Sequence, residues 1–344
     1  MRVLLRADAS PVQGTGHVMR CLTLGEELLA RGHEVALMTG GLATNWLEDY
    51  VSTTGIDVLE CAADGIDEEA IVAFRPDWVV VDSYRFPAAS VTALGRVLNV
   101  LAIVDGDHRG IEAAIYLDQN LGAESIPRPE AIRDRFLCGA PFALVRRAIL
   151  DARRAEPWRD SVGPPTVLTF MGGTDATGAN RAIAESLRAI NEACAIAMVA
   201  PVAQHPALRA AFDSRPGVTL VEPTASLPAM MGRAQVIVSA TGTSAWDICS
   251  LGVPAVLVAV VDNQRESLGA AIARGLVLGV DCVDCVDPAD MARFLGPLVA
   301  RLLRETDLRR RLSETCLALY DGRGTVRVVE AMEMRRGVGP EGRG

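Results

Sequence analysis

Short runs of β-branched and apolar residues alternate with longer amphipathic stretches along almost the whole chain. Apolar strands separated by amphipathic helices are typical of a parallel sheet that helices cover on both faces. The pattern therefore predicts an α/β fold, with helices at about 17–31 and 179–193 among those that join the strands. The predicted strands are 3–5, 34–38, 78–81, 101–104, 167–170, 195–199, 218–221, 236–238 and 255–260.

This alternation is interrupted between residues 151 and 165, where the chain is rich in Arg and Pro and shows no periodicity. At about 100–200 residues per domain, a chain of 344 residues also suggests two domains. We therefore predict two Rossmann-like, doubly wound domains, 1–155 and 156–336, followed by a Gly-rich flexible tail at 337–344.

The charged residues exclude several kinds of chemistry. All 34 basic residues are Arg, and 43 acidic residues bring the formal net charge to −9. Without Lys the chain cannot form a Schiff base or hold phosphates with a P-loop lysine. The acidic balance also argues against a nucleic-acid-binding surface. Arg309, Arg310 and Arg311 form a local basic cluster among acidic residues, which indicates a solvated helix face.

The sequence contains no segment typical of a membrane protein. No apolar run approaches the ~18 residues that a membrane span needs, and the N-terminus does not resemble a signal peptide. We therefore expect a cytoplasmic protein with free thiols. Cys282 and Cys285 have C-x-x-C spacing, but no second pair or His follows them, so we interpret them as packed cysteines in a late strand.

The turn after the first predicted strand is polar and contains glycine. It carries Arg6, Asp8, Gly14 and Gly16 and leads to His17, which begins the following helix. The positive end of the helix dipole favours a neutral imidazole there, and a neutral His can act as a general base. The alternative is a helix-start His that is satisfied by neighbouring backbone groups.

Two further turns place carboxylates at the same edge of the sheet. Asp82 and Tyr84 follow the strand 78–81, and Asp105 and Asp107 follow the strand 101–104. One carboxylate could orient the imidazole of His17 or bind sugar hydroxyls. Two aspartates could also hold a metal ion, but no third ligand lies at a fixed spacing, so we favour hydrogen bonding and expect no metal. His108, in the same acidic loop, is an outside candidate for the base.

Two loops of small residues in the second half could bind an anion. Backbone N–H groups and hydroxyls at a helix N-terminus form a phosphate cradle, although a Gly-rich connector with ordinary capping is the alternative. Without Lys, a diphosphate would rely on these groups and on Arg, with Arg265 the nearest candidate. Asp247, one turn into the next helix, could accept hydrogen bonds from ribose hydroxyls. The candidate loop residues are Gly172, Gly173, Thr174, Asp175, Ser239, Thr241, Gly242 and Thr243.

These segments, in this order, resemble one family of enzymes. Residues 239–244, Asp247, 251–254 and 262–264 resemble the nucleotide-sugar-binding half of GT-B enzymes. Over nearly its whole length the chain is similar to the UDP-sugar hydrolases of pseudaminic acid biosynthesis, which act on UDP-2,4-diacetamido-2,4,6-trideoxy-β-L-altropyranose, and to related spore coat polysaccharide proteins. The other segments that carry this similarity are 6–10, 14–24, 81–84, 138–146, 171–175 and 321–324.

The resemblance implies a hydrolase that needs neither metal nor cofactor, with an interdomain cleft between its two Rossmann-like domains. His17 would activate the water that attacks the anomeric carbon and expels UDP with inversion. Arg20, Asn263 and Gln264 join the predicted substrate site. The chain departs from the family pattern at Asp247, where Glu is usual, and at Ser83, where many members have His.

Three functions are therefore open at this stage. The first is hydrolysis of a nucleotide-activated, UDP-linked amino or deoxy sugar to free sugar and UDP. The second is a glycosyltransferase of the same fold, in which His17 deprotonates an acceptor hydroxyl instead of water. The third is a nucleotide-sugar-binding protein without turnover, and the glycines beside His17 argue weakly against it.

Overall fold

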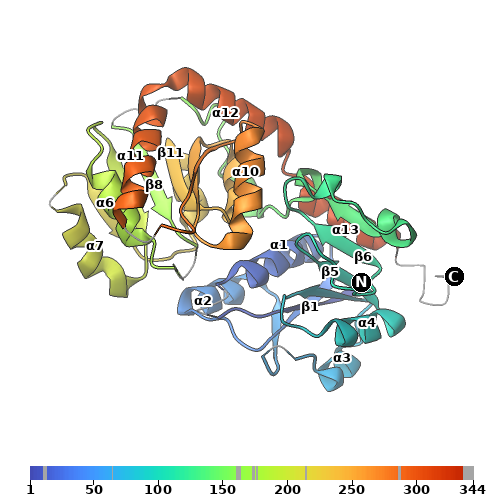
Figure 1. Cartoon of the computed structure of the whole chain (residues 1–344). Helices are drawn as coiled ribbons and strands as arrows, with labels where there is room; N and C mark the ends of the chain where they lie inside the picture. The colour runs from blue at the N-terminus through green and yellow to red at the C-terminus, as the bar shows by residue number, and fades with distance from the viewer. Residues whose placement is uncertain are drawn as a thin grey trace. The chain divides into compact units, whose positions relative to one another are not determined.

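The computed structural model describes residues 1–10, 14–63, 65–159, 164–172, 175, 177–213, 215–285 and 288–335. The chain folds into two compact units, of which the first consists of Met1–Val145 and Gly322–Gly344 and the second of Arg146–Asp321. Each unit contains one parallel sheet with helices packed against it (Figure 1). The predicted α/β class is confirmed.

The sheet of the first unit has seven strands in the order β3-β2-β1-β4-β5-β6-β7, all of them parallel. This order reverses between β1 and β4, and in such sheets ligands bind outside the carboxyl ends of the strands at that switch point. The strands are β1 Arg2–Ala7, β2 Glu34–Thr39, β3 Asp57–Glu60, β4 Trp78–Asp82, β5 Asn99–Ile103, β6 Ile115–Asp118 and β7 Phe136–Cys138. The helices are α1 Gly16–Ala30, α2 Asn45–Thr54, α3 Glu68–Phe74, α4 Ala88–Val97 and α13 Gly324–Met334, with the short 3₁₀ helices η1 Ala123–Ser125, η2 Glu130–Arg135 and η3 Ala140–Phe142.

Side chains of β1 alternate between two hydrophobic layers, because successive residues of a strand point to opposite faces. Val3 and Leu5 pack with side chains of α1, α2 and α13, whereas Leu4 packs with those of α3 and α4. All three are fully buried, and burying a side chain of this kind contributes about 1.5–3 kcal/mol. The apolar runs in the sequence thus reflect a sheet that is covered on both faces.

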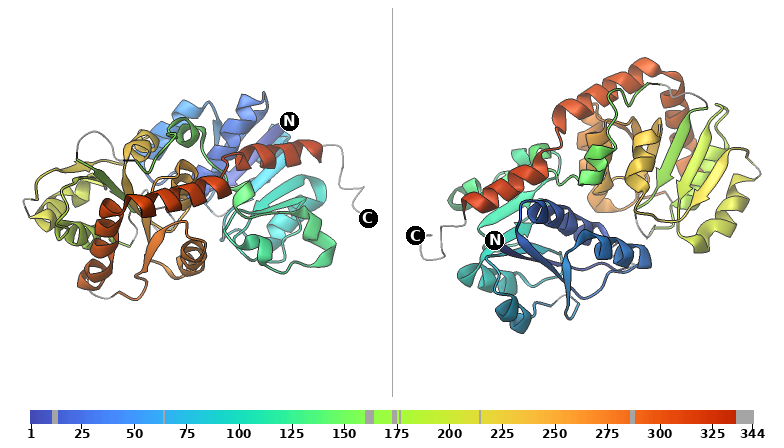
Figure 2. Two further views of the ribbon diagram at one scale, coloured as in Figure 1. Left: turned by 90° about the horizontal axis from the view of Figure 1, so that it is seen from above. Right: turned by 180° about the vertical axis from the view of Figure 1, so that it is seen from behind.

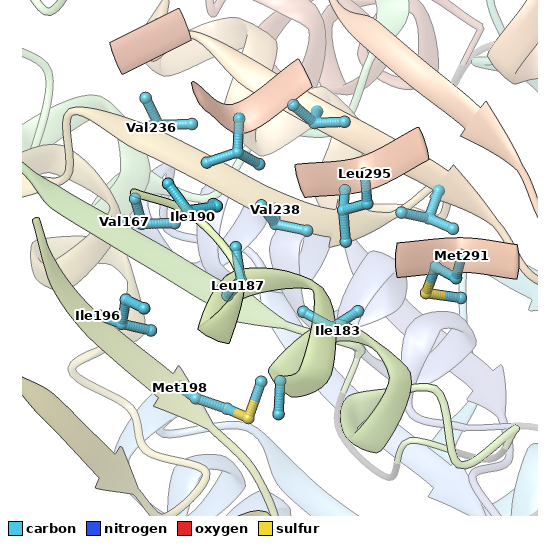
Figure 3. Close-up of a cluster of buried hydrophobic side chains, with 14 of the residues drawn as sticks. Val167, Ile183, Leu187, Ile190, Ile196, Met198, Val236, Val238, Met291 and Leu295 are labelled. Atoms are coloured by element: carbon cyan, nitrogen blue, oxygen red, sulfur yellow. The ribbon is translucent and has the colours of Figure 1, made fainter. Parts of the chain in front are cut away.

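The sheet of the second unit has six parallel strands in the order β10-β9-β8-β11-β12-β13, and its order reverses between β8 and β11. Figure 3 shows one layer of its core, in which Ile183 and Leu187 of one helix and Leu295 of another lie beside Val238 of a central strand. The strands are β8 Thr166–Phe170, β9 Ala195–Val199, β10 Val218–Val221, β11 Val236–Ala240, β12 Ala255–Ala259 and β13 Leu278–Asp281. The helices are α5 Arg147–Asp151, α6 Asn180–Arg188, α7 His205–Phe212, α8 Leu227–Arg233, α9 Ser244–Leu251, α10 Arg265–Ala273, α11 Pro288–Arg304 and α12 Thr306–Leu319, with η4 Val202–Gln204 and η5 Asp262–Gln264.

The division into units differs from the predicted boundaries at 155 and 336. The first unit ends at Val145, and helix α13 returns to it and packs against α1 (Figure 2). Val328 and Met332 of α13 are fully buried in the core of the first unit. An amphipathic pattern shows that a helix has an apolar face but not which sheet that face covers, so the return of α13 is invisible in the sequence. The predicted tail, 337–344, lies outside the described residues.

Two backbone segments are joined closely where the chain enters and leaves the first unit. A Cβ atom on Gly324 would lie 2.1 Å from the carbonyl oxygen of Ala143, so only Gly fits there. The hydroxyl of Thr325 accepts a hydrogen bond from the N–H of Val145 at 3.1 Å and donates to its carbonyl oxygen at 3.2 Å. These contacts attach the start of α13 to the end of the first segment.

Three smaller predictions need correction. The helix predicted for 179–193 ends at Arg188. Cys282 and Cys285 follow β13 in a turn rather than lying within a strand, because the N–H of Cys285 donates to the carbonyl oxygen of Cys282 at 3.3 Å. Arg309 is fully buried, while Arg310 and Arg311 are exposed as predicted. Its guanidinium donates to the carbonyls of Leu302 and Leu303 at the end of α11. The last carbonyl groups of a helix have no partner within the helix, and Arg309 is buried because it supplies their hydrogen-bond donors.

Candidate functional site

His17 lies at the switch point of the first sheet, as the second residue of α1. Its Nδ1 is 2.7 Å from Oδ1 of Asp82, the last residue of β4, and both side chains are buried. A carboxylate only accepts hydrogen bonds, so when the imidazole is neutral its proton lies on Nδ1 and its lone pair on Nε2, the tautomer that a general base requires. Nη2 of Arg20 also lies 3.1 Å from Nδ1. The partners of His17 are therefore side chains and not the backbone.

Arg20, one turn further along α1, links two carboxylates. Its Nε donates to Asp82 Oδ2 at 2.8 Å and its Nη2 to Asp82 Oδ1 at 2.7 Å, while Nη1 donates to Asp105 Oδ1 at 3.2 Å. Arg20 is only 7% exposed. We predicted a substrate-binding role for Arg20, but the structure engages it with Asp82 and Asp105, which it holds beside the imidazole.

These contacts determine the charge of Asp82. Burial raises the pKa of this carboxyl, but Arg20 and then His17 lower it by more, so the pKa lies below its ordinary value. The pKa of the Arg20 guanidinium is raised, because Asp82 and Asp105 outweigh the effect of burial. Asp82 is consequently ionised across the neutral range and available to accept the Nδ1 proton of His17.

Asp105 and Tyr84 complete a closed circle of contacts. The Tyr84 hydroxyl donates to the Asp105 carboxylate, and its ring meets the His17 ring edge to face, with centroids 4.9 Å apart and an interplanar angle of 81°. We call His17, Asp82, Arg20, Asp105 and Tyr84 the His17 network. Tyr84 is 50% exposed, so it is the member of the network most open to solvent.

Asn120 supports the network from the next strand along the sheet. It follows β6, and its Nδ2 donates to Asp105 Oδ1 at 2.7 Å and to Asp118 Oδ1 at 3.2 Å. Asp118 is fully buried, and Arg128 donates to its Oδ2 at 2.6 Å. Nothing in the sequence marked these residues, because the contacts join separate strand ends. His108 instead packs its ring against Tyr116 and Phe136, which are not part of the network.

Arg6 and Asp8, predicted to bind substrate, are engaged within the protein. Arg6 is 1% exposed, and all five of its N–H groups have acceptors. Two of them donate to Asp8, at 2.5 and 3.0 Å, and the others donate to backbone carbonyls of Met38, Ala62 and Gly65. Arg6 therefore has no N–H left for a ligand, and its role is structural.

The two predicted glycines of this turn lie beside His17. Gly14 has φ +75°, a left-handed conformation that favours Gly, and its N–H donates to the Ser10 carbonyl at 2.8 Å. Gly16 is the first residue of α1. The tight turn thus leads directly into the helix that carries His17 and Arg20.

In the second unit, Asp175 of the loop after β8 is engaged within the protein. The Asp175 carboxylate accepts the N–H groups of Ala179 and Asn180 at 2.9 and 3.3 Å, and so occupies the N-terminus of α6 itself. Asp175 is buried, and its pKa is raised because desolvation outweighs these hydrogen bonds. Gly172 has φ +70°, and Gly173 and Thr174 lie outside the described residues.

The end of β11, where Ser239 lies, and the loop that follows it retain the features of an anion site. Ser239 and Thr241 are buried, and within the described ranges neither hydroxyl has a hydrogen-bond partner. Thr243 precedes the N-terminus of α9, and a Cβ on Gly242 would meet nothing within 4 Å. A buried hydroxyl without a partner is costly, and an anion at the positive end of α9 would supply the missing acceptor. A phosphate group fits this donor set.

Asp247, predicted to accept hydrogen bonds from ribose hydroxyls, is paired with an arginine through one of its two oxygens. Arg146 donates to its Oδ2 from Nη2 at 2.7 Å and from Nε at 3.2 Å. The carboxyl is buried and its pKa is raised, because desolvation outweighs the attraction of Arg146. The sequence did not indicate this pair, whose members are 101 residues apart.

The residues after β12 are also partly engaged. Gln264 accepts the N–H of Val260 at 2.9 Å with its side-chain oxygen, whereas Asn263 is exposed. Arg265, the nearest candidate cation, forms ion pairs with three aspartates and is therefore neutralised by the protein. Its partners are Asp262, Asp281 and Asp284. In the described part of the chain, no three His, Cys, Asp or Glu side chains are grouped so that they could hold a metal ion.

No protein-family model and no curated protein sequence matches this chain. Solved structures do match it over nearly its full length. MurG from Acinetobacter baumannii has a TM-score of 0.65 at 15% identity and covers 97% of this chain and 99% of its own. The spinosyn rhamnosyltransferase SpnG, complexed with thymidine diphosphate, has a TM-score of 0.66 at 16% identity and covers 97% of this chain and 100% of its own. A co-structure of S. aureus MnaA with UDP has a TM-score of 0.65 at 14% identity and covers 97% of this chain and 96% of its own.

The chain has the GT-B fold. In its two Rossmann-like units the switch points lie at β1/β4 and β8/β11, and the candidate residues lie at or after the ends of these strands. The His17 network lies at the first switch point; at the second, Ser239 is the last residue but one of β11 and Thr241 lies directly after that strand. Among the described helices, none is long and apolar enough to cross a membrane.

Proposed function

We propose that this GT-B protein is an enzyme that hydrolyses a UDP-linked amino or deoxy sugar at its anomeric carbon, releasing free sugar and UDP. The observation that carries the proposal is the buried His17–Asp82 pair. Asp82 accepts the proton of Nδ1, so that Nε2 of the neutral imidazole can act as the base. The carboxylate also stabilises the imidazolium that forms when Nε2 takes a proton. The family resemblance of the sequence supports hydrolysis, and the precursor of pseudaminic acid is the first substrate to test.

We assign the base to a residue of the first unit and the binding of the diphosphate to residues of the second. His17 Nε2 removes a proton from water, and the water oxygen forms a bond to the anomeric carbon. The bond from that carbon to the UDP oxygen breaks, its electron pair leaves with UDP, and the anomeric configuration inverts. The hydroxyls of Ser239 and Thr241 and the N-terminus of α9 would stabilise the diphosphate, because the cation nearest in sequence, Arg265, is already paired.

A second candidate is a glycosyltransferase, since one of the solved structures similar to this chain is that of a spinosyn rhamnosyltransferase. The same Nε2 would then deprotonate an acceptor hydroxyl. The decisive experiment incubates the protein with a panel of nucleotide sugars, without acceptor and in EDTA, and identifies products by mass spectrometry. We expect free sugar and UDP at full rate. Turnover only after acceptor addition would establish the transferase, and strict dependence on a divalent metal would contradict the metal-independent mechanism.

The panel has to include several sugars, because Ser83 stands where many family members have His. Ser83 is 5% exposed, and its hydroxyl accepts the N–H of Arg85 at 3.0 Å. The side chain is therefore turned toward its own loop and contributes no imidazole to the sugar. We propose that the preferred sugar lacks a group that such an imidazole would bind.

Removal of either unpartnered hydroxyl is expected to weaken UDP binding. For Ser239→Ala or Thr241→Val we expect a loss of about 0.5–1.5 kcal/mol, or roughly two- to twelvefold in Kd, by isothermal titration calorimetry. Ser313→Ala is the matched control, since Ser313 is a buried, similarly unpartnered hydroxyl of the described chain on α12. Equal Kd values for all three variants would exclude these hydroxyls from the nucleotide site.

A further inference from the structure

The loop that carries Tyr84 is fastened by a residue that we did not single out in the sequence. Arg109 donates from Nη2 to the carbonyl oxygen of Ser83 at 2.7 Å, and from Nη1 to those of Tyr84 and Phe86 at 2.7 and 3.4 Å. One guanidinium thus binds three carbonyls within four consecutive residues. A planar fork of five donors can do this, whereas the ammonium of a Lys could not match the geometry.

The backbone of Arg109 is itself held in an unusual conformation. Its φ is +51°, a left-handed conformation that costs a non-Gly residue of order 1–3 kcal/mol. Asp107 stabilises it, because its Oδ1 accepts the N–H of Arg109 at 2.8 Å, an Asx-type turn. The structure thus explains Asp107 as the residue that shapes this turn rather than as a site carboxylate. Strain of this kind persists only where surrounding contacts determine the conformation.

Tyr84 depends on this loop because few contacts hold its side chain. It is half exposed, and in the described part of the chain its side chain contacts the His17 ring, edge to face, and the Asp105 carboxylate. At the far end of the loop Phe86 is anchored, with its buried ring 4.4 Å from the Arg6 guanidinium. Between Asp82 and Phe86, Arg109 supplies three hydrogen bonds to main-chain oxygens.

We propose that Arg109 is a positioning residue of the active site, which fixes Tyr84 against His17 and Asp105. This inference rests on the proposed function for its kinetic consequences. The Tyr84 ring packs against the His17 ring, so displacement of Tyr84 removes one support of the imidazole and lets bulk water reach the His17–Asp82 hydrogen bond. The groups that we propose for nucleotide binding belong to the second unit, whereas this loop belongs to the first. Loss of Arg109 therefore affects kcat and leaves the Kd of UDP unchanged.

The kinetic test is a double-mutant cycle. We expect Arg109→Met to lower kcat about tenfold in the wild-type background, and less than about twofold in a Tyr84→Ala background. Arg109→Lys is expected to recover part of the loss, since an ammonium can still bind some of the carbonyls. Arg133→Met, which alters an exposed Arg of the same unit, is the matched control. Additive effects of Arg109→Met and Tyr84→Ala would overturn the proposal.

A second measurement does not depend on the reaction. The chain has four His, so the imidazole proton resonances can be resolved by NMR, and the His17 signal is the one missing in His17→Asn. The Tyr84 ring lies 4.9 Å from the His17 ring and shifts that signal by its ring current. We expect Arg109→Met to move the signal in the same direction as Tyr84→Ala. An unchanged signal would contradict the positioning role even if the protein catalyses a different reaction, and Asp107→Ala provides a second variant should Arg109→Met fail to fold.

Discussion

Replacing His17 by Asn is expected to reduce turnover of the nucleotide sugar by about 10²–10⁴-fold, the usual contribution of a general base. The Asn amide still donates a hydrogen bond toward Asp82 Oδ1, which His17 contacts at 2.7 Å, so the surrounding ion pairs remain. The Kd of UDP should change by less than about twofold, because the proposed nucleotide groups lie in the second unit. Steady-state kinetics and calorimetry measure the two quantities.

His17→Ala serves as the companion variant, since it removes both the base and the hydrogen bond to Asp82. If the loss of activity comes mainly from removal of the base, the two variants lose activity to a similar degree. A much larger loss for Ala would mean that His17 acts mainly by holding the network together. Wild-type turnover in either variant would show that His17 is not the base.

The pattern of strands and turns was sufficient to predict where the site lies, because it depends on local rules. Each apolar run ends in a polar turn, and parallel strands bring these turns to one edge. That reasoning placed His17, Asp82 and Asp105 together and left open which carboxylate orients the imidazole. In the structure, the carboxylate that contacts the imidazole is that of Asp82. Asp82 is the last residue of β4 and pairs with Ala7 of β1.

The contacts that the sequence did not reveal are those between residues that are distant in the chain. Arg20 lies three residues after His17, a spacing that puts both on one helix face, yet its carboxylates come from positions 62 and 85 residues away. Arg146 and Asp247 meet across 101 residues. Arg6 was misassigned for a different reason: its charge partner Asp8 lies only two residues away, and the sequence did not show that its other donors bind backbone carbonyls.

Replacing Asp82 by Asn is expected to lower kcat by about 10²–10⁴-fold, although it changes a single atom. If the amide oxygen faces Nδ1, its NH₂ group faces Arg20 Nε–H, and two donors oppose each other. If the amide is reversed, its NH₂ donates to Nδ1, which forces the proton onto Nε2 and disables the base. In both orientations the imidazolium loses the carboxylate that stabilises it; in the serine-protease triad the equivalent change costs about 10⁴.

The pH dependence of this variant distinguishes the effect on the base from an effect on folding. The pKa of Asp82 is lowered in the folded protein, so its stabilising contribution is present above the unfolded pKa and is lost as the pH falls through the folded value. Breaking a buried ion pair costs about 3–5 kcal/mol, and we expect a smaller loss here because Asp105 still compensates Arg20. Urea unfolding should therefore show a stability difference between Asp82→Asn and wild type at neutral pH that narrows in acid. An activity profile identical to that of the wild type, in a variant that is folded and binds UDP, would exclude Asp82 as the residue that orients His17.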